Sequence, residues 1–326
     1  MKGEPKLLTQ EYSLRQEEKE LDVIAIGNIN VDLTATIDKI PEEDSEVEAK
    51  SFSINFGGSA ANFAVAASRL GLKTGIIAWV GSDVFGDLSL QDLMKEGVDV
   101  SRVKYSDSLP TGSVTVLVSP DGSRRMIAFR GANKLLSADD LDEEYLSRAT
   151  LVHASNVNIN LASEIVAKAR KLGIKFSYDP GGLGVQADKN ALEKIFSNTD
   201  ILFCNKVEVH AIVGSDDVEK CAEHLSNLAD IVIVKMGKEG ALIRSGNTLH
   251  KVPAFKVNAV DTTGAGDAFN AGFILGLLKN QPLNVAGLIA NATAALKITK
   301  AGARQGLPTL SQVKKFLESN GLFLEI

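Results

Sequence analysis

The segment from residue 261 to residue 269 reads DTTGAGDAF, and it combines two aspartates with a threonine pair and the small residues Gly264, Ala265 and Gly266. An apolar, strand-like run at 255–260 precedes this segment, and an apolar helical pattern at 268–278 follows it. Small residues at a strand-to-helix turn let backbone N–H groups point at an anion, and the helix N-terminus adds a partial positive charge there. The segment therefore predicts an anion site, such as a site for a phosphoryl group.

One carboxylate lies inside this predicted anion turn. Asp267 cannot itself bind the anion, because two negative charges repel each other. It lies beside the anion, where a general base belongs if a hydroxyl group attacks a phosphoryl group. The backbone that would hold the phosphoryl group belongs to Gly264, Ala265 and Gly266. A simple helix cap is the alternative interpretation, since Asp is common at helix starts.

Polar residues also follow the first predicted strand, at 22–27. Parallel sheets bind ligands at the carboxyl ends of their strands, and the side chains of Asn30 and Asp32 can hydrogen-bond to hydroxyl groups of a ligand there. Turn chemistry is the alternative interpretation of both residues. Arg130 ends a predicted hairpin and could clamp a phosphate or carboxylate of the substrate, although a surface arginine fits the pattern equally well.

A glycine pair precedes the first predicted helix. Gly57 and Gly58 allow close approach of the backbone to a ligand, and Asn62 lies one helical turn further on, on the same side. The alternative is a glycine bend before a tightly packed helix.

Two of these segments, Gly57-Gly58-Ser59-Ala60-Ala61-Asn62 and Asp261 to Asp267, resemble the two signatures of the ribokinase-like sugar kinases, also called the phosphofructokinase-B family. Their order and wide separation are those of the family, and family-like features run from about residue 22 to residue 308. The resemblance implies an α/β three-layer sandwich with a central, mostly parallel sheet and a small β-sheet lid. It also implies an ATP-dependent sugar kinase, a phosphotransferase with an alcohol acceptor, that uses Mg²⁺.

The resemblance further implies a division of roles among residues. The acceptor substrate is expected to contact Asn30, Asp32, Gly57, Gly58 and Asn62. The nucleotide is expected near Asn205, Lys235, Gly237, Gly240 and Asn291. Glu208 is expected to hold Mg²⁺ through water, and Asp261 and Thr263 form a possible site for a monovalent cation such as K⁺. Asn and Glu also suit helix starts, and Lys235 could simply be solvated.

The sequence departs from ribokinases proper at two places. Ser59 stands where those enzymes tend to carry Lys, and Ser155-Asn156-Val157-Asn158 stands where they carry a sugar-binding Glu. The acceptor is therefore open among a free sugar, a sugar acid, an inositol and a nucleoside, and a nucleoside kinase is the main alternative function. A catalytically silent binding protein is an alternative of a different class. A nicotinamide-dependent dehydrogenase is disfavoured, because 27–32 lacks the glycine fingerprint.

Composition limits the broader function. The chain has 326 residues with 44% hydrophobic and 23% charged residues and a formal net charge of −6, which suits a globular enzyme and gives no support to nucleic-acid binding. Cys204 and Cys221 suggest no disulfide framework, so we expect a reducing, cytoplasmic location. No apolar run is long enough to span a bilayer. Residues 1–20 form a highly charged N-terminal extension without the apolar core of a secretory signal.

Strands and amphipathic helices alternate through most of residues 21–326, which are expected to form the kinase domain and indicate a parallel sheet covered on both faces. Two stretches, 31–56 and 111–130, break this rhythm with period-two alternation and a hairpin turn at Pro120-Asp121-Gly122. We expect these stretches to form a small antiparallel sheet that covers the acceptor as a mobile lid. The resemblance to the sugar kinases also implies a homodimer through the lid as one arrangement.

Overall fold

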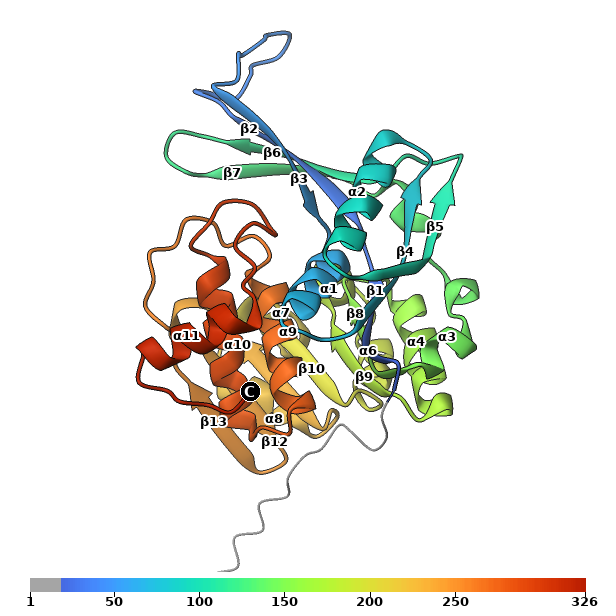
Figure 1. Cartoon of the computed structure of the whole chain (residues 1–326), viewed down its shortest axis with the longest axis vertical. Coiled ribbons are helices and arrows are strands. Elements are labelled where there is room, and N and C mark those ends of the chain that lie inside the picture. Colours follow the sequence, from blue (N-terminus) through green and yellow to red (C-terminus); the bar gives the residue numbers. More distant parts are fainter. Residues whose placement is uncertain (1–18) are drawn as a thin grey trace, which may run out of the picture.

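A nine-stranded sheet forms the centre of the computed structural model, which describes residues 19–326 (Figure 1). The strand order is β13-β12-β11-β10-β9-β8-β1-β4-β5. Neighbours from β5 to β11 are parallel, while β12 and β13 add an antiparallel hairpin at one edge. The strands are β1 (Leu21–Gly27), β4 (Thr74–Gly81), β5 (Asp99–Ser106), β8 (Ala149–Ser155), β9 (Lys175–Asp179), β10 (Ile201–Asn205), β11 (Ile231–Lys235), β12 (Ala241–Ser245) and β13 (Thr248–Val252).

Helices cover both faces of this sheet, which gives the predicted three layers. Alternate residues of β1 show why: Val23 and Ala25 belong to one buried cluster, while Ile24 and Ile26 belong to the other. The first cluster contains residues of α1 (Ser59–Arg69), α2 (Val84–Lys95), α9 (Ala265–Leu278), α10 (Leu283–Lys297) and α11 (Leu310–Ser319). The opposite side carries α3 (Glu143–Ser147), α4 (Ile159–Leu172), α5 (Gly181–Val185), α6 (Lys189–Phe196), α7 (Lys206–Val213) and α8 (Val218–Ser226), with short 3₁₀ turns η1 (Gly131–Leu135), η2 (Ala138–Asp140) and η3 (Gly237–Glu239) elsewhere.

The predicted lid segments form a second sheet, with the order β3-β2-β6-β7, that projects from the body (Figure 1). Its strands are β2 (Asn30–Thr36), β3 (Ser51–Gly57), β6 (Gly112–Val118) and β7 (Arg124–Phe129). The expectation of a purely antiparallel sheet was wrong, because the central pair, β2 and β6, is parallel. The strands β2 and β6 belong to segments that are distant in sequence, and both run through the sheet in the same direction. We call this sheet the lid.

The strand expected at 255–260 is absent from the structure, where these residues run irregularly between β13 and α9. The chain leaves the sheet edge after Val252, so the segment has no neighbouring strand to pair with. The backbone N–H groups of Val260 and Asp261 instead donate to the carbonyl oxygen of Ile298, at 2.7 and 3.2 Å. The apolar run therefore leads to the end of α10 and not into the sheet.

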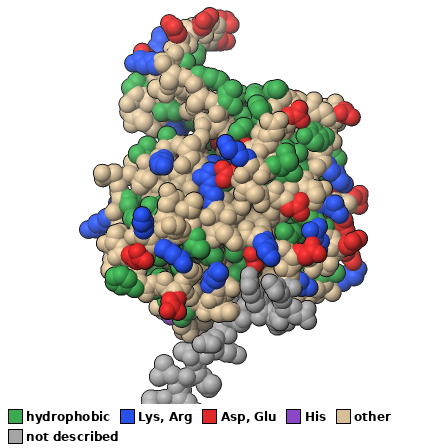
Figure 2. All heavy atoms as spheres, viewed as in Figure 1, with side chains coloured by type: hydrophobic (Ala, Val, Ile, Leu, Met, Phe, Trp, Pro, Cys, Tyr) green, Lys and Arg blue, Asp and Glu red, His purple; other side chains and the backbone are tan. Residues whose placement is uncertain are grey.

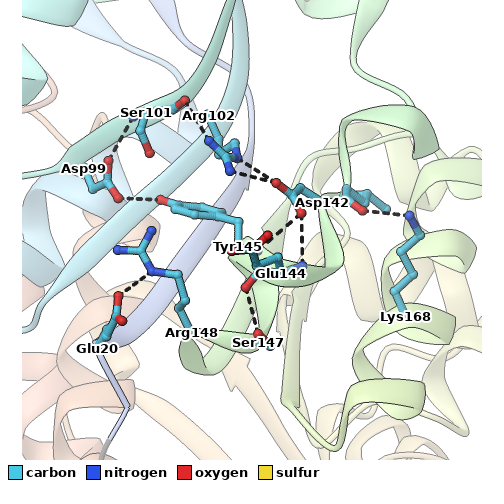
Figure 3. A network of polar contacts seen from close by, with 11 residues as sticks. Glu20, Asp99, Ser101, Arg102, Asp142, Glu144, Tyr145, Ser147, Arg148 and Lys168 are labelled. Atoms are coloured by element: carbon cyan, nitrogen blue, oxygen red, sulfur yellow. Dashed lines mark hydrogen bonds and ion pairs between the residues drawn. The ribbon is translucent and has the colours of Figure 1, made fainter.

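The edge strand β5 is fastened to the body by a polar network away from the lid (Figure 3). Arg102 Nη2 lies 2.7 Å from Asp142 Oδ2 at the start of α3, and the hydroxyl of Tyr145 donates to Asp99 Oδ2 at 3.1 Å. The guanidinium groups of Arg102 and Arg148 lie 5.0 and 5.2 Å from the centre of the Tyr145 ring. Charged side chains protect an exposed strand edge against pairing with other chains.

The predicted extension, residues 1–20, lies almost wholly outside the described residues. Within residues 19–326, no helix combines the length and apolar character that crossing a membrane requires.

Candidate active site

A cavity of about 930 Å³ lies between the lid and the body. Its walls come from the lid strands β2, β3, β6 and β7, the start of α1, the turn before α9 and the loop after α10. Several predicted site residues line it together, although they are far apart in sequence: Asn30, Asp32, Gly58, Asn62, Asp261, Thr263, Gly264 and Asp267. The structure therefore brings the two sequence signatures to one place.

The predicted anion turn is the N-terminus of α9. Gly264 is the N-cap residue and has a φ of 77°, and a Cβ atom there would lie 2.7 Å from the carbonyl oxygen of Ala303. Glycine is therefore required by both the backbone conformation and the space. The N–H of Ala265 donates to the carbonyl of Thr262 at 3.1 Å, so Gly264 and Gly266 are the better candidates for holding a phosphoryl group.

Asp267 lies in the first turn of α9 and lines the cavity. Asn62 Nδ2 donates to Asp267 Oδ2 at 3.0 Å, which joins the second signature to the first. Burial raises the pKa of Asp267 to about 7, although the hydrogen bond from Asn62 opposes this rise. A carboxylate with a pKa near neutrality is suited to take a proton from a hydroxyl group.

Arg304, which the sequence did not single out, fixes the orientation of Asn62. Its side chain is buried, and Nε donates to Asn62 Oδ1 at 3.1 Å, which leaves the amide nitrogen of Asn62 for Asp267. Nη1 and Nη2 bind Asp92 Oδ2 at 2.5 Å and the carbonyl of Gly57 at 2.9 Å. Arg304 therefore positions Asn62 and the glycine pair at once.

We expect Arg304→Gln to lower kcat by about tenfold, the factor of one lost hydrogen bond in the chain Arg304–Asn62–Asp267. Arg304 lowers the pKa of Asp267, so its removal should shift the acid limb of the kcat/KM profile to higher pH. The pH profile checks this. Arg304→Lys keeps the charge without the forked geometry and should retain the wild-type limb. An unchanged profile in Arg304→Gln would contradict the positioning role.

Asp32 points from β2 into the cavity, beside the glycine pair. A Cβ atom on Gly57 would lie 2.5 Å from Asp32 Oδ2, so only glycine permits this close approach. Burial raises the pKa of Asp32 to about 6, and the guanidinium of Arg304 opposes this shift. Asp32 is thus a hydrogen-bond acceptor whose charge is lost in mildly acidic solution.

Lys235, at the end of β11, lies behind the anion turn and is not freely solvated. Its Nζ is 2.6 Å from Asp179 Oδ2, and Asn270 Nδ2 donates to the same oxygen at 2.7 Å. A Cβ atom on Gly266 would lie 3.4 Å from Lys235 Nζ, which places the ammonium next to the turn. Burial disfavours both charges, but each stabilises the other, so the pKa of Lys235 is raised and that of Asp179 is lowered.

Asn205 and Glu208 form a capping box at the start of α7. The N–H of Glu208 donates to Asn205 Oδ1 at 2.9 Å, and the N–H of Asn205 donates to Glu208 Oε2 at 2.8 Å. Burial and the neighbouring Asp179 raise the pKa of Glu208. No group of three or more His, Cys, Asp or Glu side chains within residues 19–326 could hold a metal ion. The single carboxylate of Glu208 fits Mg²⁺, because this ion keeps several waters and takes only one or two carboxylates together with substrate phosphates.

Four other predicted site residues lie outside the cavity lining. Asn291 is buried, and its Nδ2 donates to the carbonyls of Val252 and Pro253 at 3.1 and 3.0 Å. Gly237 is the first residue of the turn η3 that follows β11, and Gly240 is the residue directly after this turn. Arg130 is exposed, whereas Arg124 from the same hairpin lines the cavity.

The predicted monovalent-cation site already has cationic donors. Asp261 Oδ1 accepts from Arg124 Nη1 at 2.9 Å and from the N–H of Thr263 at 2.9 Å, and Oδ2 accepts from the N–H of Gly302 at 2.9 Å. The carbonyl oxygen of Asp261 accepts from Lys297 Nζ at 2.8 Å. A free cation would have to share these oxygens with a guanidinium and an ammonium, so the residues do not fit K⁺.

Comparisons with known proteins show which proteins this chain resembles in sequence and fold. The chain is 35% identical over 296 residues to an ATP-dependent ribose-1-phosphate kinase of Halopiger xanaduensis, covering 90% of this chain and 97% of that protein. The fold matches the nucleoside kinase of Methanocaldococcus jannaschii, with a TM-score of 0.82, 26% identity and coverage of 93% and 100%. It also matches a putative ribokinase II of E. coli in complex with ATP and Mg²⁺, with a TM-score of 0.81, 27% identity and coverage of 92% and 99%.

The model of the pfkB family carbohydrate kinases matches residues 20–310. Both signatures, the anion turn and the cavity that joins them lie within that range. The chain therefore belongs to the pfkB family of carbohydrate kinases, and it is a phosphotransferase whose acceptor is a hydroxyl group.

Proposed function

We propose that this protein is a magnesium-dependent kinase that transfers the γ-phosphoryl group of ATP to a hydroxyl group of a small carbohydrate. The observation that carries the proposal is the position of Asp267. It lines the cavity beneath the lid and also belongs to the first turn of α9, where an anion is stabilised. One carboxylate therefore lies between an acceptor site and a phosphoryl site.

The chemistry assigned to the residues is positioning and charge stabilisation. Asp267 takes the proton of the attacking hydroxyl, and Asn62 holds the carboxylate in place through its 3.0 Å hydrogen bond. The backbone at Gly264 and Gly266 stabilises the phosphoryl group as its charge changes. Asn30 and Asp32 bind hydroxyl groups of the acceptor from the lid side of the cavity.

The nucleotide is proposed to lie along the ends of β10 and β11, outside the acceptor cavity. Lys235 brings a positive charge to the back of the anion turn, which supports a place near the donor phosphates. Asn205 and Glu208 follow β10, and Glu208 would hold hydrated Mg²⁺ there. When bound, the ion would neutralise charge on the donor phosphates. Gly237 and Gly240 would shape the nucleotide site through their backbone, and Asn291 would do so by holding the carbonyls of Val252 and Pro253 with its side-chain amide.

A phosphorylation screen tests the proposal. ATP and Mg²⁺ are supplied with pentoses, pentose phosphates, hexoses, sugar acids, inositols and nucleosides, and ADP release is measured. We expect turnover with a carbohydrate bearing a free hydroxymethyl or anomeric hydroxyl group. Asp267→Asn in the same screen controls for contaminating kinases. Turnover with none of these acceptors would favour a silent binding protein.

A nucleoside kinase is the second candidate, and the lid wall of the cavity favours it. Val114, Val116, Val118 and Met126 line that wall, and apolar side chains there could contact a flat base. The same screen separates the candidates, because a nucleoside kinase would prefer a nucleoside over its free sugar by a large factor in kcat/KM.

The lid is proposed to be mobile and to close over the acceptor. Side-chain contacts hold it against the body in the structure: Arg124 binds Asp261 and Thr263, at 2.9 and 2.8 Å, and Gln305 Nε2 donates to Asn55 Oδ1 at 2.7 Å. A small sheet with few buried contacts opens at a lower free energy than the body. Closure would exclude water from the transferring phosphoryl group.

We expect Arg124→Ala to weaken this closure, with an acceptor KM about 3- to 10-fold higher and faster hydrogen exchange in 112–129. Acceptor should protect the lid strands in the wild type and protect them less in the variant. Arg125→Ala is the matched control, because Arg125 is the next residue on the exposed strand β7, where neighbouring side chains point to opposite sides. Exchange that is unaffected by acceptor in the wild type would contradict the lid assignment.

We propose that the outer face of the lid supports a homodimer. On β2 and β3, alternation places polar residues such as Asp32 and Asn55 toward the cavity and apolar side chains such as Phe52 and Ile54 outward. The exposed fractions are 62% for Phe52, 52% for Ile54 and 67% for Ile127, and Figure 2 shows apolar side chains gathered over the lid. Sedimentation should show a dimer that Ile54→Lys dissociates; a monomeric wild type at micromolar concentration would exclude it.

A reducing, cytoplasmic location remains a proposal. Cys204 and Cys221 are both buried and free, which supports it.

A further inference from the structure

Lys297 is a fully buried lysine that the proposed chemistry does not use. It is the last residue of α10, and its exposed fraction is 0%. Lysine is almost never fully buried unless its ammonium group has a partner. Here the partner is the carbonyl oxygen of Asp261, which accepts from Nζ at 2.8 Å.

This contact lies directly beneath the anion turn. Asp261 opens the segment that leads to Gly264, and the N–H groups of Val260 and Asp261 both donate to the carbonyl of Ile298 at the end of α10. The N–H of Gly302 holds the carboxylate of Asp261 at 2.9 Å. The segment before the anion turn is thus fastened to the end of α10 and to the loop that follows it.

The surroundings of the ammonium group are those that attract a cation. The C-terminal end of α10 carries a partial negative charge, a backbone carbonyl points at Nζ, and the carboxylate of Asp261 is nearby. Burial lowers the pKa of Lys297, and Asp261 opposes that shift. A second cation at this place would be repelled by both Lys297 and Arg124.

We propose that the ammonium group of Lys297 takes the place of a monovalent cation beneath the anion turn, so that this kinase needs no K⁺. Lys297 acts as a positioning residue: it holds the carbonyl of Asp261 and thereby the backbone of the anion turn. This inference rests on the proposed kinase function for its kinetic tests, but its thermal test does not require turnover.

The first experiment compares the wild-type protein in K⁺, Na⁺ and tetramethylammonium chloride at equal ionic strength. Tetramethylammonium is too large to enter a buried cation site, so it serves as the cation-free reference. We expect equal melting temperatures and kcat/KM values within twofold in all three salts. A higher melting temperature in K⁺, or activation above about threefold, would overturn the proposal even if the protein turned over no acceptor.

The second experiment uses Lys297→Met and Lys297→Ala, with Lys315→Met on the exposed side of α11 as the control for loss of a lysine. In tetramethylammonium, both Lys297 variants should lose about 10- to 100-fold in kcat/KM, the factor for a lost hydrogen bond from a charged group. In Lys297→Ala, K⁺ should restore activity and raise the melting temperature, because the space of the side chain becomes available.

The two variants separate the effect of losing the ammonium charge from the effect of losing the side-chain volume. Lys297→Met keeps most of the apolar volume, so wild-type activity in this variant would show that the ammonium group is not needed and would overturn the proposal. A folded Lys297→Ala that no cation rescues would assign Lys297 to packing alone and would overturn it as well. Should either variant fail to fold, the salt series on the wild type still decides.

Discussion

Asp267→Asn should lower turnover by at least about 10²- to 10⁴-fold, because general-base catalysis contributes that much. The variant keeps the shape of the side chain and a partner for Asn62, so the fold and ATP binding should remain. Steady-state kinetics and a separate nucleotide titration check the two parts. A variant with near-normal turnover would remove Asp267 from the mechanism.

The same substitution should stabilise the protein. The pKa of Asp267 is about 7 in the folded state, against an ordinary value of 3.8. Between these values the folded state binds more protons than the unfolded state, so this carboxylate costs stability as pH rises. Asn removes that cost. Because the carboxylate is partly accessible to solvent, we expect a gain of about 1–3 kcal/mol at about pH 8, and a smaller gain at about pH 5. Thermal melts at both pH values measure it.

Asp32→Ala should weaken acceptor binding by about 10- to 150-fold and leave ATP binding nearly unchanged, because a hydrogen bond to a charged group contributes about 1.5–3 kcal/mol. Calorimetric titration of each substrate separately tests the difference. Since the pKa of Asp32 is about 6, wild-type acceptor affinity should also fall below about pH 6, as the carboxylate becomes protonated.

Asp32→Asn is the matched variant, because it keeps the volume and removes the titration. Its acceptor affinity should be lower and should lack the fall near pH 6 that protonation of Asp32 causes. An unchanged acceptor affinity with weakened ATP binding in Asp32→Ala would mean that the two substrates bind in the opposite places.

The parts of the site that could be predicted from the sequence depend on residues that lie close together in the chain. The anion turn could be recognised because Gly264 and Asp267 are close in sequence and their types suit a helix start. The motif of Asn205 and Glu208 is local too, and in the structure it forms the capping box of α7, while its role toward the nucleotide and Mg²⁺ stays a prediction. The lid strands were predicted because period-two alternation differs from the helical period around them.

The missed features depend on contacts between distant residues. Arg304 lies 242 positions from Asn62, and Arg124 lies 137 positions from Asp261, so no spacing rule could find either contact. The apolar run at 255–260 failed as a strand for a related reason. An alternating or apolar pattern describes one chain segment, whereas a strand also needs a neighbour, and the sheet ends at β13.

The contact of Arg124 with Asp261 and Thr263 has a thermodynamic consequence. A lid strand over the proposed acceptor cavity touches the segment that leads to the proposed phosphoryl site. An acceptor that favours the closed lid therefore also favours one arrangement of the donor site. Linkage makes such a coupling reciprocal: whatever factor the acceptor adds to the affinity for ATP, ATP adds to the affinity for the acceptor. The two substrates of this kinase should accordingly bind with synergy.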